Sequence, residues 1–293
     1  MAKGESSGDV MVAVEDPDQV QQLVRTAGDL ARLGSGTVRL VTVVVKPYDS
    51  PFGVFTDETI IREFAADSHD LLERATPPAD VDVVRDLVVA RSVAKGILRA
   101  VKQSEPRALV IGWEADPSRS DAILGTTVDA VLERAPTDVY VERIGRVADG
   151  VESVLLPVAG GPHVEAAAAV AKAIAVRNEA AILVLAIATD ETEVVEAGSF
   201  AEAGRKAVLG APGPEVPVET TVREGRVSDE IVEAAEDHDV IVLGAARKGP
   251  LRGRLVGSVP RRVVERSDRT VLIARDGAVA GGLQSRLAAL LNR

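Results

Sequence analysis

The segment Val240–Val264, VIVLGAARKGPLRGRLVGSVPRRVV, decides how we interpret this chain. Its apolar beginning, Val240–Leu243, predicts a buried strand, and its end has the apolar spacing of a helix. Between them, Gly244–Ser258 is a glycine-rich loop with four basic residues and no acidic residue. Ligands of open α/β sheets bind beyond the carboxyl ends of the strands, and a helix N-terminus favours negative charge. We therefore expect this loop to hold an anion, with nucleotide phosphate as the first candidate.

The same unit occurs earlier in the chain, so the sequence is a tandem repeat. The segment Ala108–Gly112 corresponds to Val240–Gly244 at an offset of 132 positions, and Gly125-Thr126 corresponds to Gly257-Ser258. Nearer the start of each half, strand-like segments and the helical patterns after them recur at an offset of about 144 positions. The difference predicts an insertion in the first half, which we place in the turn-rich segment 46–60.

Each half alternates strands and helices in an order that favours a parallel sheet with right-handed crossovers. The helices have apolar residues at i, i+3 and i+4 spacing. We predict an α/β fold of two tandem, doubly wound, five-stranded parallel-sheet domains, covering residues 1–147 and 148–277, with a helical tail at 278–293. The last strands, Val139–Val141 and Val271–Ala274, should pair across a pseudo-twofold axis as an internal pseudo-dimer. Further homodimerisation is left open.

Composition narrows the class of protein. The 293 residues carry a net charge of −11, which argues against binding to nucleic acid. The chain has no cysteine, no apolar run of the ~20 residues needed to cross a bilayer, and no signal sequence, so we expect a cytoplasmic protein that is not inserted in a membrane. The acidic excess and the preference for arginine over lysine fit a salt-adapted, halophile protein; high-GC codon bias explains them equally well.

The two corresponding loops differ in charge. Residues 244–258 carry Arg247, Lys248, Arg252 and Arg254, whereas residues 112–126 carry three acidic residues and one arginine. A polyphosphate would be attracted to the second loop and repelled by the first. Ser258 should be the N-cap of the following helix, and Pro260 should lie in its first turn, where a missing N–H costs nothing. The alternative is that Gly257-Ser258 is only a helix start and the arginines form a solvated face.

At these residues the chain resembles the universal stress protein family. ATP-binding members have Gly, two residues, Gly, nine residues, Gly and Ser or Thr between the fourth strand and the fourth helix. Gly244, Gly257 and Ser258 fit that spacing, as do Gly112, Gly125 and Thr126. The segments LLPVAGGPH (155–163) and GAARKGPLRGRLVGSVP (244–260) resemble the stress-protein domains of amino-acid and cation transporters. The resemblance covers almost the whole chain and implies a Rossmann-like fold of the adenine-nucleotide α-hydrolase type.

The resemblance also implies a nucleotide site in the second half, occupied by ATP or another adenine nucleotide, with or without Mg²⁺. By position, the base and ribose contacts fall on Pro157, Val158, Ala159 and Ile187. The phosphate and ribose contacts fall on Leu243, Gly244, Ala246, Arg247, Gly257, Ser258, Val259 and Pro260.

Two positions depart from the family pattern. The second glycine is Arg247 here and Ala115 in the first half, and the usual aspartate after the first strand is Ala159 here and Glu15 in the first half. An arginine at position 247 could replace a backbone contact to phosphate with a charged one. The departures are equally consistent with another anion, such as AMP or a cyclic dinucleotide.

Other kinds of site have weaker support. The sequence has no P-loop, and Gly34-Ser35-Gly36 is better explained as a helix C-terminus than as a dinucleotide loop. The three histidines have no ligand-like spacing; only His163 lies near the predicted crevice, as a ligand contact or a loop residue. No nucleophile, base and orienting acid occur together, so we expect no enzyme, although slow ATP hydrolysis stays open. We expect a regulatory stress-response protein that binds nucleotide; the alternative is a ligand-free interaction module for a partner such as a membrane transporter.

Overall fold

The computed structural model describes residues 8–46, 55–113, 125–145, 150–245 and 257–279. The first half contains the strands β1 (Val10–Ala13), β2 (Val38–Val45), β3 (Val83–Ala90), β4 (Ala108–Gly112) and β5 (Asp138–Arg143). Its helices are α1 (Val20–Leu33), α2 (Asp57–Phe64), α3 (Ala66–Glu73), α4 (Val93–Ser104) and α5 (Thr126–Arg134). The predicted helical tail lies almost wholly outside the described residues.

The second half repeats the pattern. Its strands are β6 (Ser153–Val158), β7 (Ala181–Ala188), β8 (Val218–Glu224), β9 (Val240–Gly244) and β10 (Thr270–Arg275). Its helices are α6 (Val164–Asn178), α7 (Val194–Gly210), α8 (Val227–Ala234) and α9 (Ser258–Arg266), with short 3₁₀ turns at Glu191–Glu193 and Ala235–Asp237. None of the described helices has both the length and the apolar character needed to cross a membrane.

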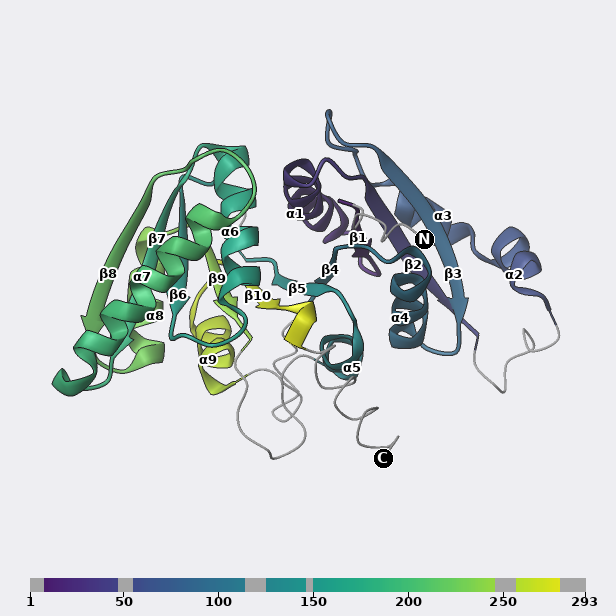
Figure 1. Ribbon diagram of the computed structural model, residues 1–293. Helices are drawn as coiled ribbons and strands as arrows, with labels where there is room; N and C mark the ends of the chain where they lie inside the picture. Colours follow the sequence, from purple (N-terminus) through teal and green to yellow (C-terminus); the bar gives the residue numbers. More distant parts are fainter. Residues whose placement is uncertain (1–7, 47–54, 114–124, 146–149, 246–256, 280–293) are drawn as a thin grey trace, which may run out of the picture.

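All ten strands form one sheet in the order β3-β2-β1-β4-β5-β10-β9-β6-β7-β8 (Figure 1). Strands within each half are parallel, as predicted. The order of connections reverses between β1 and β4 in the first half and between β6 and β9 in the second. These are the switch points at which a doubly wound sheet opens a crevice.

The two halves join where β5 and β10 pair antiparallel, which confirms the predicted pseudo-dimer. Val141 pairs with Ile273, and these residues also correspond to each other in the repeat, so the pseudo-twofold axis passes between them. Corresponding arginines extend the symmetry, because Arg143 Nη1 donates to the Ser267 carbonyl (2.8 Å) and Arg275 Nη2 donates to the Ala135 carbonyl (2.7 Å).

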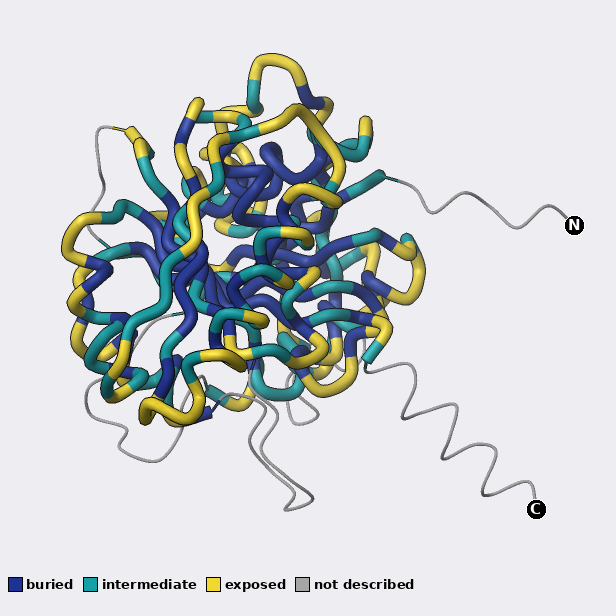
Figure 2. Tube along the Cα trace, turned by 60° about the vertical axis from the view of Figure 1, so that its left-hand side comes forward, coloured by how far each residue is buried: buried dark blue, intermediate teal, exposed yellow. Residues whose placement is uncertain are grey.

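Helices cover both faces of the sheet, and the two faces are built differently. On one face, α1, α6 and α7 pack over a single apolar core that runs through both halves, with α1 directly against α6 (Figure 1). On the other face, the first half buries α4 and α5, and the second half buries α8 and α9, in separate cores. Buried chain runs through the interior of the molecule (Figure 2), and the paired strands β5 and β10 are mostly buried, whereas the edge strands β3 and β8 are mostly partly exposed. The shared face therefore couples the halves beyond the β5–β10 pair.

Local sequence explains the central helices. The apolar positions that the helical spacing predicts for α1 are all buried: Val20, Leu23, Val24, Ala27, Leu30 and Ala31. Gly34 follows the helix as its C-cap, as expected. Helix α6 is rich in alanine and is buried on most of its surface, because it lies between α1, α7 and the sheet. Its one buried cation, Lys172, donates from Nζ to the Ala211 carbonyl (2.6 Å), so the charge reaches the C-terminal end of α7, where a helix dipole favours it.

The extra residues of the first half lie mainly between β2 and β3. Strand pairing joins Val38 to Val83, which are 45 positions apart, and Ile182 to Val218, which are 36 apart. This connection thus holds nine of the twelve extra residues, and the other three lie between β3 and β4. The prediction of a single insertion at 46–60 was wrong in extent, because the two short helices α2 and α3 replace the continuous helix α7; residues 47–54 lie outside the described residues.

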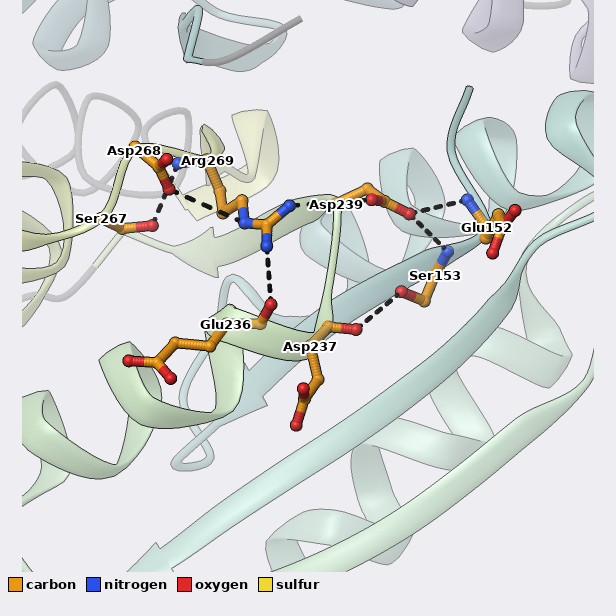
Figure 3. Close-up of polar contacts among 8 residues, drawn as sticks. All are labelled: Glu152, Ser153, Glu236, Asp237, Asp239, Ser267, Asp268 and Arg269. Atoms are coloured by element: carbon orange, nitrogen blue, oxygen red, sulfur yellow. Dashed lines mark hydrogen bonds and ion pairs between the residues drawn. The ribbon is translucent and has the colours of Figure 1, made fainter. Parts of the chain in front are cut away.

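A polar network fastens the amino ends of β6, β9 and β10 (Figure 3). Asp239 Oδ2 accepts hydrogen bonds from the backbone N–H groups of Glu152 (2.8 Å) and Ser153 (3.1 Å). Arg269 Nη2 donates to the Glu236 carbonyl (2.6 Å), and its Nη1 lies 3.9 Å from Asp239 Oδ1. These contacts fix the start of the second half against strands that occur about 90–120 residues later in the chain.

Two carboxyl groups are buried between the halves. Glu142 of β5 is fully buried, and its Oε1 accepts a hydrogen bond from Gln22 Nε2 of α1 (3.0 Å), while its Oε2 has no hydrogen-bond partner among the described residues. Burial raises the pKa of Glu142 to about 7. Asp29 of α1 is paired with Arg32 (2.7 Å), yet burial raises its pKa to about 7 as well. Both groups line a cavity of about 50 Å³ beneath α1.

We expect Glu142→Gln to change how stability depends on pH. The folded protein holds the Glu142 proton up to about pH 7, whereas the unfolded chain releases it near 4.5. The carboxyl group is therefore most favourable to folding at low pH, and this contribution is lost as pH rises toward 7. Relative to the wild type, the variant should gain roughly 1–3 kcal/mol of unfolding free energy between pH 5 and pH 8, measured by chemical denaturation. An offset that does not change with pH would contradict the assignment, and the exposed Glu219→Gln is the control.

The centre of the β5–β10 junction should be sensitive to truncation. Ile273 is 1% exposed, so Ile273→Ala removes apolar contacts from the junction and should lower the free energy of unfolding by about 2–4 kcal/mol. Val195 is 85% exposed, so Val195→Ala should stay within about 0.5 kcal/mol of the wild type. Equal effects of the two substitutions in denaturant titrations would argue against a packed junction.

Candidate functional site

The second half has a crevice at its predicted switch point. Strands β6 and β9 pair only at Val154 and Leu155, whereas β6 pairs with β7 along its whole length. The carboxyl-terminal part of β6 is thus separated from β9, and a cavity of about 340 Å³ opens between them. It is bounded by the ends of β6, β7 and β9 and by the first turns of α6, α8 and α9.

The structure brings most of the predicted site residues together around this cavity. Those that line it are Pro157, Val158, Ala159, Ile187, Leu243, Gly244, Val259 and Pro260. Gly257 and Ser258 precede and begin α9 directly beside the lining residues Val259 and Pro260. Ala246 and Arg247, with the rest of the basic loop at 246–256, lie outside the described residues.

The start of α9 differs from the prediction in one respect. Gly257 occupies the N-cap position and Ser258 is the first helical residue, so the prediction of Ser258 as N-cap was wrong. The glycine has no side chain, and no side-chain hydrogen bond caps this end. Pro260 lies in the first turn, as expected. Because a helix leaves its first N–H groups without intrahelical partners, those of Ser258 and Val259 remain directed out of the helix end beside the cavity.

Sequence reasoning missed two glycines that shape the site. Gly160 and Gly161 follow β6, line the cavity and have φ angles of +69° and +92°. Side chains rarely adopt this left-handed region, and a Cβ on Gly160 would lie 2.7 Å from Cε1 of Phe200. The adjacent pair of glycines was the available signal, since it predicts a turn that needs positive φ.

His163 lies at the N-terminus of α6 and lines the cavity while being only 4% exposed. Its Nδ1 accepts a hydrogen bond from the backbone N–H of Asp276 (3.2 Å), beyond the end of β10. This bond places the hydrogen of the neutral imidazole on Nε2. Gly244 packs against the same histidine, since a Cβ there would lie 3.4 Å from the His163 Cβ. The histidine thus has a structural contact at one nitrogen and forms part of the cavity wall.

The cavity lining is apolar apart from His163 and backbone groups. Among the described residues that line it, none is Asp, Glu, Lys or Arg. Such walls suit a flat heterocycle, while the α9 N-terminus and the sequence of the adjoining basic loop suit an anionic group. The residues present therefore fit an adenine nucleotide. In the described part of the chain, no three acidic or histidine side chains are grouped as metal ligands.

The first half retains a crevice at the corresponding switch point. Its cavity of about 450 Å³ lies at the carboxyl ends of β1, β2 and β4. The two sets of lining residues occupy corresponding positions: Val14, Val43, Ile97 and Gly112 match Val158, Ile187, Ile231 and Gly244. Duplication has thus kept a crevice at the same place in both halves, although β1 pairs with β4 at all four of its residues and β6 pairs with β9 at only two.

The tandem, doubly wound architecture with one switch-point crevice in each half defines the class of protein. Residues 7–143 and 150–275 each match the universal stress protein family, and the chain belongs to that family. A comparison with curated proteins gave no match.

Solved structures share the fold over the whole chain. A protein from Pseudomonas aeruginosa UCBPP-PA14 described as a universal stress protein has a TM-score of 0.61 at 16% identity, covering 97% of this chain and 98% of that one. A universal stress protein from Archaeoglobus fulgidus DSM 4304 has a TM-score of 0.60 at 16% identity, covering 92% and 97%. The cytoplasmic domain of a prokaryotic cation chloride cotransporter has a TM-score of 0.56 at 11% identity, covering 92% and 96%.

The glycine turn at the cavity can be tested with a matched pair of substitutions. Gly160→Ala adds both left-handed strain and a clash with Phe200, whereas Gly161→Ala adds strain without a neighbour within 4 Å. Gly161→Ala should cost about 1 kcal/mol of unfolding free energy, and Gly160→Ala should cost about 1–2 kcal/mol more. Thermal and denaturant unfolding measure both. A smaller loss for Gly160→Ala than for Gly161→Ala would contradict the packing of this turn.

Proposed function

We propose that the second half binds an adenine nucleotide, ATP or a related one, and that its occupancy regulates a protein partner or the assembly of the chain. The base would lie in the apolar cavity, and the phosphates would lie at the N-terminus of α9 and the basic loop. The juxtaposition of an apolar cavity with a helix N-terminus that has glycine as N-cap is the observation that carries the proposal.

Each part of the proposed site contributes differently. Pro157, Val158, Ile187 and Leu243 provide apolar surface for the faces of a purine, because they border the cavity on three neighbouring strands. The backbone N–H groups of the first turn of α9 supply donors for phosphate oxygens. The basic residues at 247–254 add the positive charge that a polyphosphate needs in an otherwise acidic protein. An Mg²⁺ ion, where one accompanies the nucleotide, would be held chiefly by the phosphates.

The proposal describes regulation and not turnover. The described part of the crevice offers no paired nucleophile and base, and its one ionisable lining residue, His163, already accepts a hydrogen bond from the backbone at Nδ1. Slow hydrolysis of bound ATP would need little more than positioning. Phosphate release followed over hours measures that rate directly.

A nucleotide-free interaction module is the second candidate. The same tandem fold occurs in the cytoplasmic domain of a prokaryotic cation chloride cotransporter, which is consistent with a role beside a membrane transporter. In that case both crevices would serve only the packing of the sheet, and no nucleotide would bind to either half.

Calorimetric titration with ATP, AMP and a cyclic dinucleotide separates the two candidates. We expect the wild type to bind at least one of them with one site per chain, and Arg247→Glu to weaken binding about tenfold or more, because it reverses a charge in the basic loop. Arg119→Glu makes the same change of charge in the corresponding loop of the first half and should leave affinity within about twofold. Absence of heat with every nucleotide would favour the interaction module.

A steric variant tests the location independently of charge. Ala159 lines the cavity and is itself exposed, so Ala159→Trp should fill the space for the base and abolish nucleotide binding without loss of folding. Thermal unfolding of the variant without ligand checks that the fold is kept. Unchanged affinity in Ala159→Trp would place the nucleotide elsewhere on the chain.

A further inference from the structure

The cavity of the first half has the same walls as that of the second half but a different set of polar groups. Where the positions correspond, Glu15, Asp16, Thr42 and Thr127 of the first half stand against Ala159, Gly160, Ala186 and Val259 of the second. All four residues of the first half line its cavity. Each difference adds an oxygen that can accept a hydrogen bond, and none adds a cation.

The charge of this lining is negative. Among the described residues around the cavity, Glu15 and Asp16 are acidic and none is Lys, Arg or His. Asp16 is partly engaged, because its Oδ1 accepts from the Asp18 backbone N–H (2.9 Å) and its Oδ2 accepts from Gln19 Nε2 (3.1 Å). Glu15 is exposed and makes neither a hydrogen bond nor an ion pair with any described residue. The hydrogen bonds of Asp16 give this carboxylate a structural role before α1, whereas no contact with a described residue gives Glu15 such a role.

Thr42 is a second, independent sign of a ligand. It lies on β2, lines the cavity and is only 5% exposed. Its hydroxyl makes no hydrogen bond with any described residue, and its oxygen is not one of their fully buried unpartnered atoms, so the hydroxyl is open to the cavity. The corresponding Ala186 shows that the fold does not require a hydroxyl there. A ligand with a hydrogen-bond donor would give this hydroxyl a partner.

Gln19 occupies the point in the first crevice that corresponds to the proposed anion contact in the second crevice. A Cβ on Gly112 would collide with Oε1 of Gln19, so this amide oxygen covers the glycine at the end of β4. Gln19 corresponds to His163, which borders Gly244 in the second half. An acceptor oxygen at this point repels phosphate and favours a donor or a positive charge.

We propose that the crevice of the first half binds a small organic cation, an apolar body that carries a protonated primary amine. The apolar body packs among Val14, Val43, Ile97 and Val128, and the ammonium group lies among the acceptor oxygens of Glu15, Asp16 and Thr42. A cavity of about 450 Å³ admits a bicyclic amine. This site is separate from the nucleotide site proposed for the second half and does not depend on it.

Three indole derivatives that differ in charge test the site on the full chain: tryptamine is cationic, tryptophol is neutral and indole-3-acetate is anionic. Calorimetric titration should show tryptamine binding at least tenfold more tightly than tryptophol and no binding of indole-3-acetate. Glu15→Gln should weaken tryptamine binding at least fivefold, with tryptophol unaffected. Glu219→Gln, an exposed change of the same charge on β8, should leave tryptamine binding unchanged.

Thr42→Val keeps the size of the side chain and removes the hydroxyl, so it should weaken tryptamine binding about fivefold while thermal unfolding stays cooperative. The proposal is overturned if tryptamine does not bind, if it binds no better than tryptophol, or if Glu15→Gln leaves its affinity unchanged. Addition of ATP distinguishes the two sites. Competition between ATP and tryptamine would place both in one crevice and overturn the proposal, whereas independent binding supports it. Failure of ATP to bind would affect only the nucleotide site.

Discussion

The antiparallel pairing of β5 with β10 is the interaction on which the rest of the structure depends. Its register is symmetric about Val141 and Ile273, so each half presents the same edge to the other, as in an isologous dimer. Pairing these edges leaves neither β5 nor β10 as an exposed strand, which would otherwise invite association with other chains. The covalent tandem makes this contact intramolecular, and the halves are therefore free to diverge elsewhere as long as this junction is kept.

The junction also explains where the buried polar groups lie. One face of the sheet holds a continuous core under α1 and α6, and Glu142 and Asp29 lie within this region between the halves. At the ends of the paired strands, Arg143 and Arg275 each bind a backbone carbonyl of the opposite half. Burying such charged side chains costs free energy, but few arrangements of the two halves satisfy their hydrogen bonds. Apolar packing holds the halves together, while these hydrogen bonds act at fixed points along the junction.

The fold was largely predictable from the sequence, and the site was predictable in part. The alternation of strands and helices sufficed to predict the parallel sheet. The repeat and the apolar strand Val271–Ala274 sufficed to predict the central pairing. Each of these features is a local sequence pattern or a copy of one. Eight of the predicted nucleotide residues surround one cavity. The N-cap was assigned to Ser258 because serine is a preferred N-cap residue. The helix begins one residue earlier than that assignment implies, so Gly257 is the N-cap. Burial of Asp29 and Glu142, 113 positions apart, depends on tertiary packing and has no local signal.

The two crevices lie at corresponding places in the sheet but have different polar linings. The strands and helices that bound each cavity occupy corresponding places in the sheet, although the cavities differ in volume, at about 450 Å³ and about 340 Å³. Polarity is set by the side chains at the first turn after β1 or β6 and on the neighbouring strand. Gly160 and Gly161 take up positive φ, and the described lining of the second cavity contains no Asp, Glu, Lys or Arg. At the corresponding points of the first half, Asp16 adds a carboxylate and Pro17 restricts the backbone φ angle. In the two proposals, a few substitutions around the crevice redirect recognition from anions to cations while the order of the strands stays the same.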